Sequence, residues 1–447
     1  MYQPQTRPGP VMPVTPSSAP EIPLPPEPQS VEQTGLTIGF LADLALKTLY
    51  LRGQMTMSEL STALGLPIAN VTDKVMDFLK TERLVEIRGG TGLSSAGYPF
   101  VIVDRGSEKA QEALNRSQYV GKAPVPLATY IAAVQRQTVS NITVSQEELA
   151  RAFAHMVIPR ETLGQLGPAI NSGRSIFLFG PPGNGKTTIA EVLVSLLRGE
   201  VVLPYAVEVD QQVIKVYDQV YHRAALDPVV ADRLRFDHRW VVSKRPIVMT
   251  GGELTLETLD LIYDDTSKFY EAPFQMKANG GIFMVDDFGR QRVSPKDLLN
   301  RWIVPLEKRI DYLTLHTGKK IEIPFDMLIV FSTNLDPADL VDEAFLRRIR
   351  YKIGIEAPTV AQYEEIFKRM CAHKEIEYRA EALSQILAHY RRKNLGLRSC
   401  HPRDILEQLH DTARFLGRPA ELTPDLIEMA CDSYFVSLDP SGSPQGA

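Results

Sequence analysis

A short apolar run that leads into a glycine-rich loop constrains the fold of this chain more than any other feature. Ser175 to Phe179 is suited to a buried strand, and Gly180-Pro-Pro-Gly-Asn-Gly-Lys-Thr187 follows at once. A helix is predicted from Thr188 to about Arg198. The eight loop residues match the pattern GxxxxGK[ST] in the strand–loop–helix setting that this pattern requires. The sequence therefore predicts an α/β fold built around this loop.

The residue types in the loop point to phosphate binding. Glycines let several backbone N–H groups point at one phosphate, and the helix N-terminus adds the positive end of its dipole. Lys186 is expected to reach the β- and γ-phosphates of ATP, and the Thr187 hydroxyl is expected to hold Mg²⁺. The alternative is a plain glycine turn, which the strand before it and the helix after it disfavour. The predicted nucleotide-binding residues of this segment are Gly180, Pro181, Pro182, Gly183, Asn184, Gly185, Lys186, Thr187 and Thr188.

Two later apolar runs also end in polar residues. Gly281 to Val285 ends in Asp286 and Asp287, and Met327 to Phe331 leads through Ser-Thr to Asn334. In an open α/β sheet, residues at these strand ends lie beside the phosphate loop. We expect Asp286 to hold Mg²⁺, Asp287 to orient and polarise the attacking water, and Asn334 to hydrogen-bond the γ-phosphate or that water. The alternatives are a solvated acidic turn and a simple turn at a strand end.

Composition places the chain among ordinary globular proteins. It has 447 residues, of which 44% are hydrophobic and 23% charged, and its length predicts roughly two to four domains. A formal net charge of −5 gives no global attraction to nucleic acid or anionic lipid. Three widely spaced cysteines disfavour disulfides and zinc and fit a reducing compartment. No apolar run approaches the roughly 20 residues of a membrane span, and no secretory signal is evident, so we expect a cytoplasmic protein.

The rest of the chain divides by composition. Residues 1–30 contain ten prolines and are predicted to be a disordered tail. Residues 31–120 show three helical patterns and then strands at Leu84–Ile87 and Phe100–Val103, joined by a glycine turn at residues 89–92, an order that resembles a winged helix. Residues 121–144 are interpreted as a linker, and residues 437–447 as a second disordered tail.

Charge indicates which partner the winged-helix-like unit suits. Residues 31–120 carry nine Lys and Arg against ten Asp and Glu. The third helix, Pro67 to about Glu82, would read the groove in a DNA-binding version, but it has Lys74 and Lys80 against three acidic residues. This is a poor match for a phosphate surface. We therefore favour a protein-contacting or autoregulatory unit, with DNA binding as the alternative.

Five segments in this order resemble the motifs of the AAA+ ATPases. They are Gly180–Thr187 (Walker A), Phe283–Asp287 (Walker B), Ser332–Asn334 (sensor 1), Ala344–Arg348 (the arginine-finger region) and His401–Asp404 (sensor 2). The resemblance covers roughly residues 145–436. It implies a P-loop NTPase core at residues 145–356, with a parallel sheet flanked by helices. It also implies a C-terminal helical lid at residues 357–436, for which the sequence shows repeated helical patterns.

The resemblance also implies roles for three arginines. Arg347 or Arg348 would be a finger that reaches the γ-phosphate held by a neighbouring subunit, and Arg403 would close over the nucleotide from the lid. The alternatives are a solvated basic run for the first two, and a surface salt bridge of Arg403 with Asp404 or Glu407. A finger that acts on a neighbour implies a homo-oligomeric ring, usually a hexamer.

One position departs from the family pattern. The family usually has Glu where Asp287 stands, and a carboxylate displaced by about 1 Å can cost on the order of 10²-fold in rate. We hypothesise an ATP-hydrolysing, chaperone-like machine that remodels an unidentified protein client. The alternatives are a nucleic-acid-directed ATPase or ATP-gated regulator, and an assembly that holds ATP without turnover. Phe269, Tyr270 and Phe274 are candidates for an aromatic pore loop, with core packing as the alternative.

Overall fold

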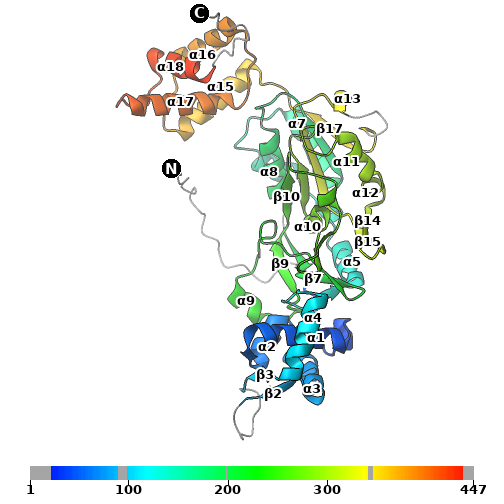
Figure 1. The fold of residues 1–447 in the computed structure, drawn as a ribbon. Helices are drawn as coiled ribbons and strands as arrows, with labels where there is room; N and C mark the ends of the chain where they lie inside the picture. The colour runs from blue at the N-terminus through cyan, green and yellow to red at the C-terminus, as the bar shows by residue number, and fades with distance from the viewer. Residues whose placement is uncertain (1–21, 89–97, 198, 341–345, 436–447) are drawn as a thin grey trace, which may run out of the picture.

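The structure is a computed structural model that describes residues 22–88, 98–197, 199–340 and 346–435 (Figure 1). The predicted tails at residues 1–21 and 437–447 and the glycine turn at residues 89–92 lie outside these ranges, as do Ala344 and residue 345 of the arginine-finger region. Among the described residues, no helix has both the length and the apolar composition needed to cross a bilayer.

A five-stranded parallel sheet lies at the centre of the chain. Its strands follow the order β10 (Ile247–Thr250), β13 (Ile282–Val285), β16 (Leu328–Thr333), β5 (Ser175–Phe179) and β17 (Tyr351–Gly354). The three apolar runs predicted to be strands are therefore the three neighbouring strands β13, β16 and β5. Because all five strands are parallel, the polar residues that follow them meet at one edge of the sheet.

Alternate residues of the central strands pack into different cores, because successive side chains of a strand point to opposite faces. Leu178 packs with α7 (Arg160–Asn171) and α8 (Lys186–Leu196) on one face. Phe177 packs with α11 (Pro295–Arg301) on the other. Both faces of the parallel sheet thus carry helices (Figure 1), and the predicted α/β fold, a parallel sheet flanked by helices, is confirmed. The remaining helices of this region are α6 (Gln146–Ala152), α10 (Phe274–Ala278), α12 (Ile303–Lys308) and α13 (Pro337–Leu340).

A second sheet, which the sequence did not predict, lies between the parallel sheet and the N-terminal unit (Figure 1). Its order is β11 (Ile262–Asp264), β12 (Phe269–Glu271), β8 (Gln212–Lys215), β7 (Ala206–Val209) and β4 (Val125–Pro126). Beside it, β6 (Glu200–Pro204) pairs with β9 (Trp240–Lys244), and β14 (Ile310–Thr314) pairs with β15 (Lys320–Pro324). The short helix α9 (Pro228–Arg233) precedes β9.

The aromatic candidates for a pore loop pack into cores. Tyr270 is 1% exposed within the core of the second sheet. Phe269 packs against the core of the N-terminal unit, where it meets Tyr119 edge to face at 5.8 Å. Phe274 packs against the core of the parallel sheet. The structure therefore favours the packing interpretation of these three residues.

In two segments the observed structure differs from the prediction. Residues 121–144 do not form a linker, because they contain β4 and helix α5 (Leu127–Arg136), in which Tyr130 and Val134 are buried. Prolines and polar residues around this helix concealed its apolar spacing. Residues 22–30 do not belong to a disordered tail, because Ile22 and Leu24 pack against the core of the second sheet.

The N-terminal unit contains the predicted helices and strands. Helices α1 (Ile38–Arg52), α2 (Met57–Leu64) and α3 (Asp73–Thr81) precede β2 (Val85–Ile87) and β3 (Phe100–Ile102), and β1 (Gln54–Met55) and α4 (Asp104–Arg116) complete the unit. Thr56 and Glu59 form a capping box at the start of α2. The third helix begins later than predicted, because Asn70 has a φ of 63°. The resemblance of the unit to a winged helix stays a prediction.

A buried ion pair just before β9 contacts the N-terminal unit. Arg239 pairs with Asp237 at 2.8 Å, and each side chain is 4% exposed. Arg239 also donates to the carbonyl oxygens of Thr34 at 2.7 Å and Pro124 at 3.3 Å. Since a buried charge that loses its partners is strongly destabilising, this contact holds the unit in one orientation.

Four helices form the C-terminal lid and pack around a core of their own. They are α15 (Val360–His373), α16 (Ala380–Lys393), α17 (His401–Phe415) and α18 (Pro424–Tyr434). All four lie within residues 357–436, where the sequence shows repeated helical patterns. Figure 1 shows the lid at one end of the molecule and the N-terminal unit at the other.

His401 is expected to make the stability of the lid depend on pH. Its side chain shares a 2.5 Å hydrogen bond with the Tyr390 hydroxyl, and burial, aided by the charge of Arg398, lowers the pKa of His401 from 6.5 to about 4. The unfolded chain therefore takes up a proton near pH 6.5, whereas the folded lid does so near pH 4. The contribution of His401 is complete above pH 6.5 and falls toward pH 4 by on the order of 1–3 kcal/mol.

Thermal unfolding measured from about pH 7 to about pH 4 tests this expectation. The His401→Gln variant, which has no proton to take up in this range, should lose less stability than the wild type as the pH falls. Parallel curves for the two proteins would contradict the assignment.

Candidate functional site

The loop between β5 and α8 has a backbone that glycine adopts and other residues resist. Gly180 and Gly183 have φ values of 136° and 79°. A Cβ atom at Gly183 would lie 2.6 Å from the sulfur of Cys400, and one at Gly180 would lie 2.3 Å from the carbonyl oxygen of Ile355. The loop borders a cavity of 900 Å³, whose lining includes the predicted residues Pro182, Gly183, Asn184, Gly185, Lys186, Thr187 and Thr188. This backbone has the form of an anion cradle at a helix N-terminus.

Lys186 holds its ammonium group at the loop. Nζ donates to the carbonyl oxygens of Gly180 and Pro181, each at 2.9 Å, and to Oδ1 of Asn334 at 2.7 Å. Burial lowers the pKa of Lys186, and the charges of Asp286 and Asp287 oppose that effect. The side chain is 6% exposed, so its charge acts in a partly desolvated setting, where it interacts strongly with an anion.

Side chains from three strand ends join in one network. Thr187 Oγ1 donates to Asp286 Oδ2 at 3.0 Å, which places two oxygen atoms of the kind that Mg²⁺ prefers side by side. Asn334 accepts from Lys186 and donates through Nδ2 to Asp287 Oδ1 at 3.0 Å. The structure therefore brings together the loop, acidic and amide residues that the sequence assigned to one site.

The backbone after β13 aims the Asp287 carboxylate at Asn334. Asp287 has a φ of 47°, in the left-handed region that aspartate tolerates better than most residues. Its N–H donates to Asp286 Oδ1 at 3.0 Å, and the next N–H, of Phe288, donates to the carbonyl of Ser332 at 2.7 Å. A tight turn, rather than a longer side chain, thus carries the carboxylate to the neighbouring strand end.

The lid contacts the phosphate loop directly. The Cys400 N–H donates to the carbonyl of Gly183 at 2.9 Å, and the Ser399 N–H donates to Asn184 Oδ1 at 3.1 Å. Asn184 is 5% exposed, and its Nδ2 has no hydrogen-bond partner within the described part of the chain. Because a buried donor without a partner is costly, this atom is suited to an oxygen of a bound ligand.

Sequence reasoning missed the segments that close the other side of the cavity. Residues 155–159 and 355–358 line it, and both lie between regular elements. Arg369 of α15 donates to the carbonyl oxygens of Ala154 at 2.8 Å and Met156 at 3.2 Å, which ties the lid to the first of these segments. Their one visible signal is the apolar run before Pro159, which carries no periodicity.

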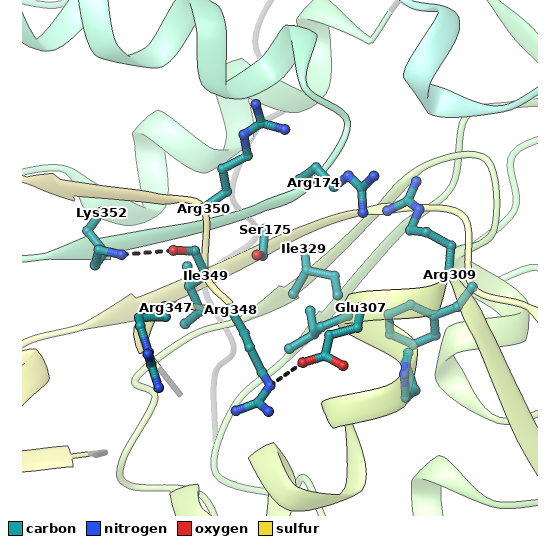
Figure 2. A pocket seen from close by; sticks show the side chains of 13 residues that line it. Arg174, Ser175, Glu307, Arg309, Ile329, Arg347, Arg348, Ile349, Arg350 and Lys352 are labelled. Carbon is teal, nitrogen blue, oxygen red and sulfur yellow. Dashed lines mark hydrogen bonds and ion pairs between the residues drawn. The ribbon is translucent and has the colours of Figure 1, made fainter. Parts of the chain in front are cut away.

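The arginines assigned by family resemblance lie in two places. Arg403 lines the same cavity as Lys186, but its guanidinium pairs with Asp404 at 2.8 Å, as the surface-salt-bridge interpretation predicted. Arg347 and Arg348 line a different cavity (Figure 2), and Arg348 pairs there with Glu307 at 2.6 Å. Within one chain these two arginines do not join the network around Lys186.

The residues around the loop fit a nucleoside triphosphate with Mg²⁺. Around the loop lie glycines at positive φ, an ammonium group and an amide donor without a partner among the described residues, and a hydroxyl lies beside a carboxylate. The described residues contain no cluster of three His, Cys, Asp or Glu side chains that could hold a metal by themselves. Mg²⁺ that is bound together with phosphates needs one or two carboxylates only.

Comparison with known proteins finds limited similarity. Residues 359–433 match a family model described as a domain of unknown function (DUF8689). No curated protein matches the chain. The structure of NtrX from Brucella abortus in complex with ADP is 17% identical, with a TM-score of 0.38 over 76% of this chain and 68% of that chain. The Thermotoga maritima RuvB Holliday junction branch migration motor is 15% identical, with a TM-score of 0.33 over 66% and 72%.

Proposed function

We propose that this chain binds ATP at the loop between β5 and α8 and hydrolyses it, as an ATPase of the AAA+ type. The observation that carries the proposal is the bridge in which Asn334 links Lys186 to Asp287. An ammonium group, an amide and a carboxylate around a glycine cradle are the groups that phosphoryl transfer to water requires.

Each residue of the bridge has a defined task in this proposal. Lys186 exchanges its contact with Asn334 for oxygen atoms of the γ-phosphate and balances their charge. Asn334 is then free to hold the attacking water, and Asp287 accepts the proton of that water as it attacks phosphorus. Thr187 and Asp286 would hold Mg²⁺, which neutralises charge on the phosphates when bound. Arg403 reaches the same cavity from the lid once it leaves Asp404.

A second chain completes the site in this proposal. β5 begins at Ser175, which lines the cavity of Arg347 and Arg348, and leads at its other end into the loop. The two arginines and the loop therefore lie at opposite edges of the sheet. In a head-to-tail ring, the arginine edge of one chain meets the loop edge of the next. We propose a homo-oligomeric ring, with six copies as the expected number.

Mixing two inactive variants should restore turnover if the site lies between chains. The Lys186→Ala chain keeps its arginines, and a chain with both Arg347→Ala and Arg348→Ala keeps its loop. In an equimolar mixture, one interface in four pairs an intact loop with intact arginines. We expect phosphate release of about a quarter of the wild-type rate. No gain on mixing, or full activity of the arginine variant alone, would argue against a shared site.

We propose a protein client, selected or regulated through the N-terminal unit. The unit carries no excess of positive charge, and on α3 Lys80 is paired with Asp77 at 2.8 Å. A cation that is neutralised in this way adds little to a phosphate-binding surface. Retention of the protein on DNA at moderate salt, with a steep loss of affinity as salt rises, would favour a nucleic-acid-directed ATPase instead.

A further inference from the structure

The cavity at the opposite edge of the parallel sheet is strongly basic (Figure 2). It has a volume of 690 Å³ and lies where β5 and β17 begin, beside α12. Among the described residues, its charged lining consists of six cations and one carboxylate, which are Arg174, Arg309, Arg347, Arg348, Arg350, Lys352 and Glu307. In a chain with a formal net charge of −5, this is a local reversal of sign.

Internal contacts account for only part of this charge. Arg348 pairs with Glu307 and Arg309 pairs with Asp326, each at 2.6 Å. Lys352 donates to two backbone carbonyl oxygens, at 2.8 and 2.9 Å. Within the described part of the chain, these pairs leave other guanidinium groups of the cavity without a balancing anion.

Arg174 and Arg350 have no acidic or hydrogen-bond partner for their side chains among residues 22–88, 98–197, 199–340 and 346–435. Figure 2 shows the guanidinium groups of Arg174 and Arg309 directed toward one another, with Arg350 on the same side of the cavity. Burial and the charge of Arg174 lower the pKa of Arg309, against the effect of Asp326. Like charges held this close repel one another unless an anion lies between them.

We propose that this cavity is a second ligand site, which binds a polyphosphate anion through Arg174, Arg309 and Arg350. A guanidinium group is planar and always charged, and its N–H fork matches two oxygen atoms of one phosphate. Phe325 and Ile329 border the cavity from the core beneath it, where they are 0% and 1% exposed, so its accessible lining is mainly charged. Its volume lies within the range of small-molecule sites.

The second site is separate from the phosphate loop of the same chain. Ser175 at the start of β5 lines this cavity, whereas Gly183, beyond the end of β5, lines the other. Lys352 lines both, so a ligand in one cavity alters the electrostatic setting of the other. The same phosphate chemistry is also offered by a nucleotide that a neighbouring chain holds, and the experiment separates the two sources.

The test uses the full-length Lys186→Ala chain, in which the phosphate loop lacks its ammonium group. Calorimetric titration with inorganic tripolyphosphate at low salt should show one binding event per chain. Its affinity should not change with protein concentration and should fall as salt is added. Adding Arg174→Ala and Arg350→Ala should weaken binding by about tenfold to hundredfold, because each removes hydrogen bonds to a charged group.

Lys320→Ala in the same background is the matched control, since Lys320 is an exposed cation of β15 outside both cavities. It should leave the affinity unchanged, and thermal unfolding should show that every variant is folded. The proposal is overturned if the Lys186→Ala chain binds no tripolyphosphate, or if replacing Arg174 and Arg350 has no effect. It is also overturned if binding appears only as protein concentration rises, because the phosphates would then lie between chains.

Discussion

Replacing Lys186 by alanine is expected to remove nucleotide binding at the phosphate loop and to lower ATP turnover by at least about 10²- to 10³-fold. The ammonium group of Lys186 donates hydrogen bonds to Gly180, Pro181 and Asn334. The residue as a whole is 6% exposed. Without it, the charge of the phosphates would enter a partly desolvated site with two carboxylates nearby. Magnesium-dependent phosphate release at several protein concentrations measures the effect.

A matched lysine shows whether the loss is specific. Lys296 of α11 is exposed and lies outside both cavities, so Lys296→Ala should keep wild-type turnover. Thermal unfolding of both variants checks that the sheet is intact. Wild-type turnover in folded Lys186→Ala protein would remove the basis for the assignment.

Asp287→Asn is expected to separate nucleotide binding from hydrolysis. Asparagine keeps the size of the side chain and an oxygen for the Nδ2 group of Asn334, but it does not accept a proton from water. Turnover should fall by about 10²- to 10⁴-fold, while the affinity for ATP with magnesium should change little. The comparison of phosphate release with equilibrium nucleotide binding, on the same preparation, measures both effects.

The wild-type rate decides between hydrolysis and simple holding of ATP. If the wild type and Asp287→Asn show equal, near-zero rates, the chain holds ATP without turnover. Asp287→Glu provides a second comparison, because it adds the methylene that the family usually has. Since the turn at Asp287 already places its carboxylate 3.0 Å from Asn334, we expect Asp287→Glu to give no gain in rate.

The residues of the site that could be predicted from the sequence are those that directly follow the ends of strands. Ser175–Phe179, Ile282–Val285 and Leu328–Thr333 are apolar runs with polar residues directly after them, and each is local in the sequence. A parallel sheet then places their ends at one edge, so Lys186 and Asn334 meet although 148 positions separate them. Local pattern and sheet geometry were sufficient for this step.

The second sheet could not be predicted from the sequence, because its strands are short and pair over long distances in the chain. Its strands are two to four residues long, which is too short to show a period, and β4 pairs Val125 with Val207 far along the chain. The helix after β4 was hidden among prolines and polar residues. Long-range pairing of short strands leaves no local pattern, so residues 121–144 were interpreted as a linker.

Conformation and spatial charge were also beyond sequence reasoning. The left-handed backbone of Asp287 decides where its carboxylate points. No pattern in the neighbouring residues predicts this backbone conformation. The basic cavity gathers arginines from residues 174, 309 and 350, which are far apart in the chain. Only the arrangement of β5 and β17 with the end of α12 brings these charges together.

The most direct test of the central claim is calorimetric titration of ATP into the folded wild-type chain, with and without magnesium. The account predicts saturable, magnesium-dependent uptake of ATP that Lys186→Ala removes. Folded wild-type protein that takes up no ATP in a magnesium-dependent manner would contradict it.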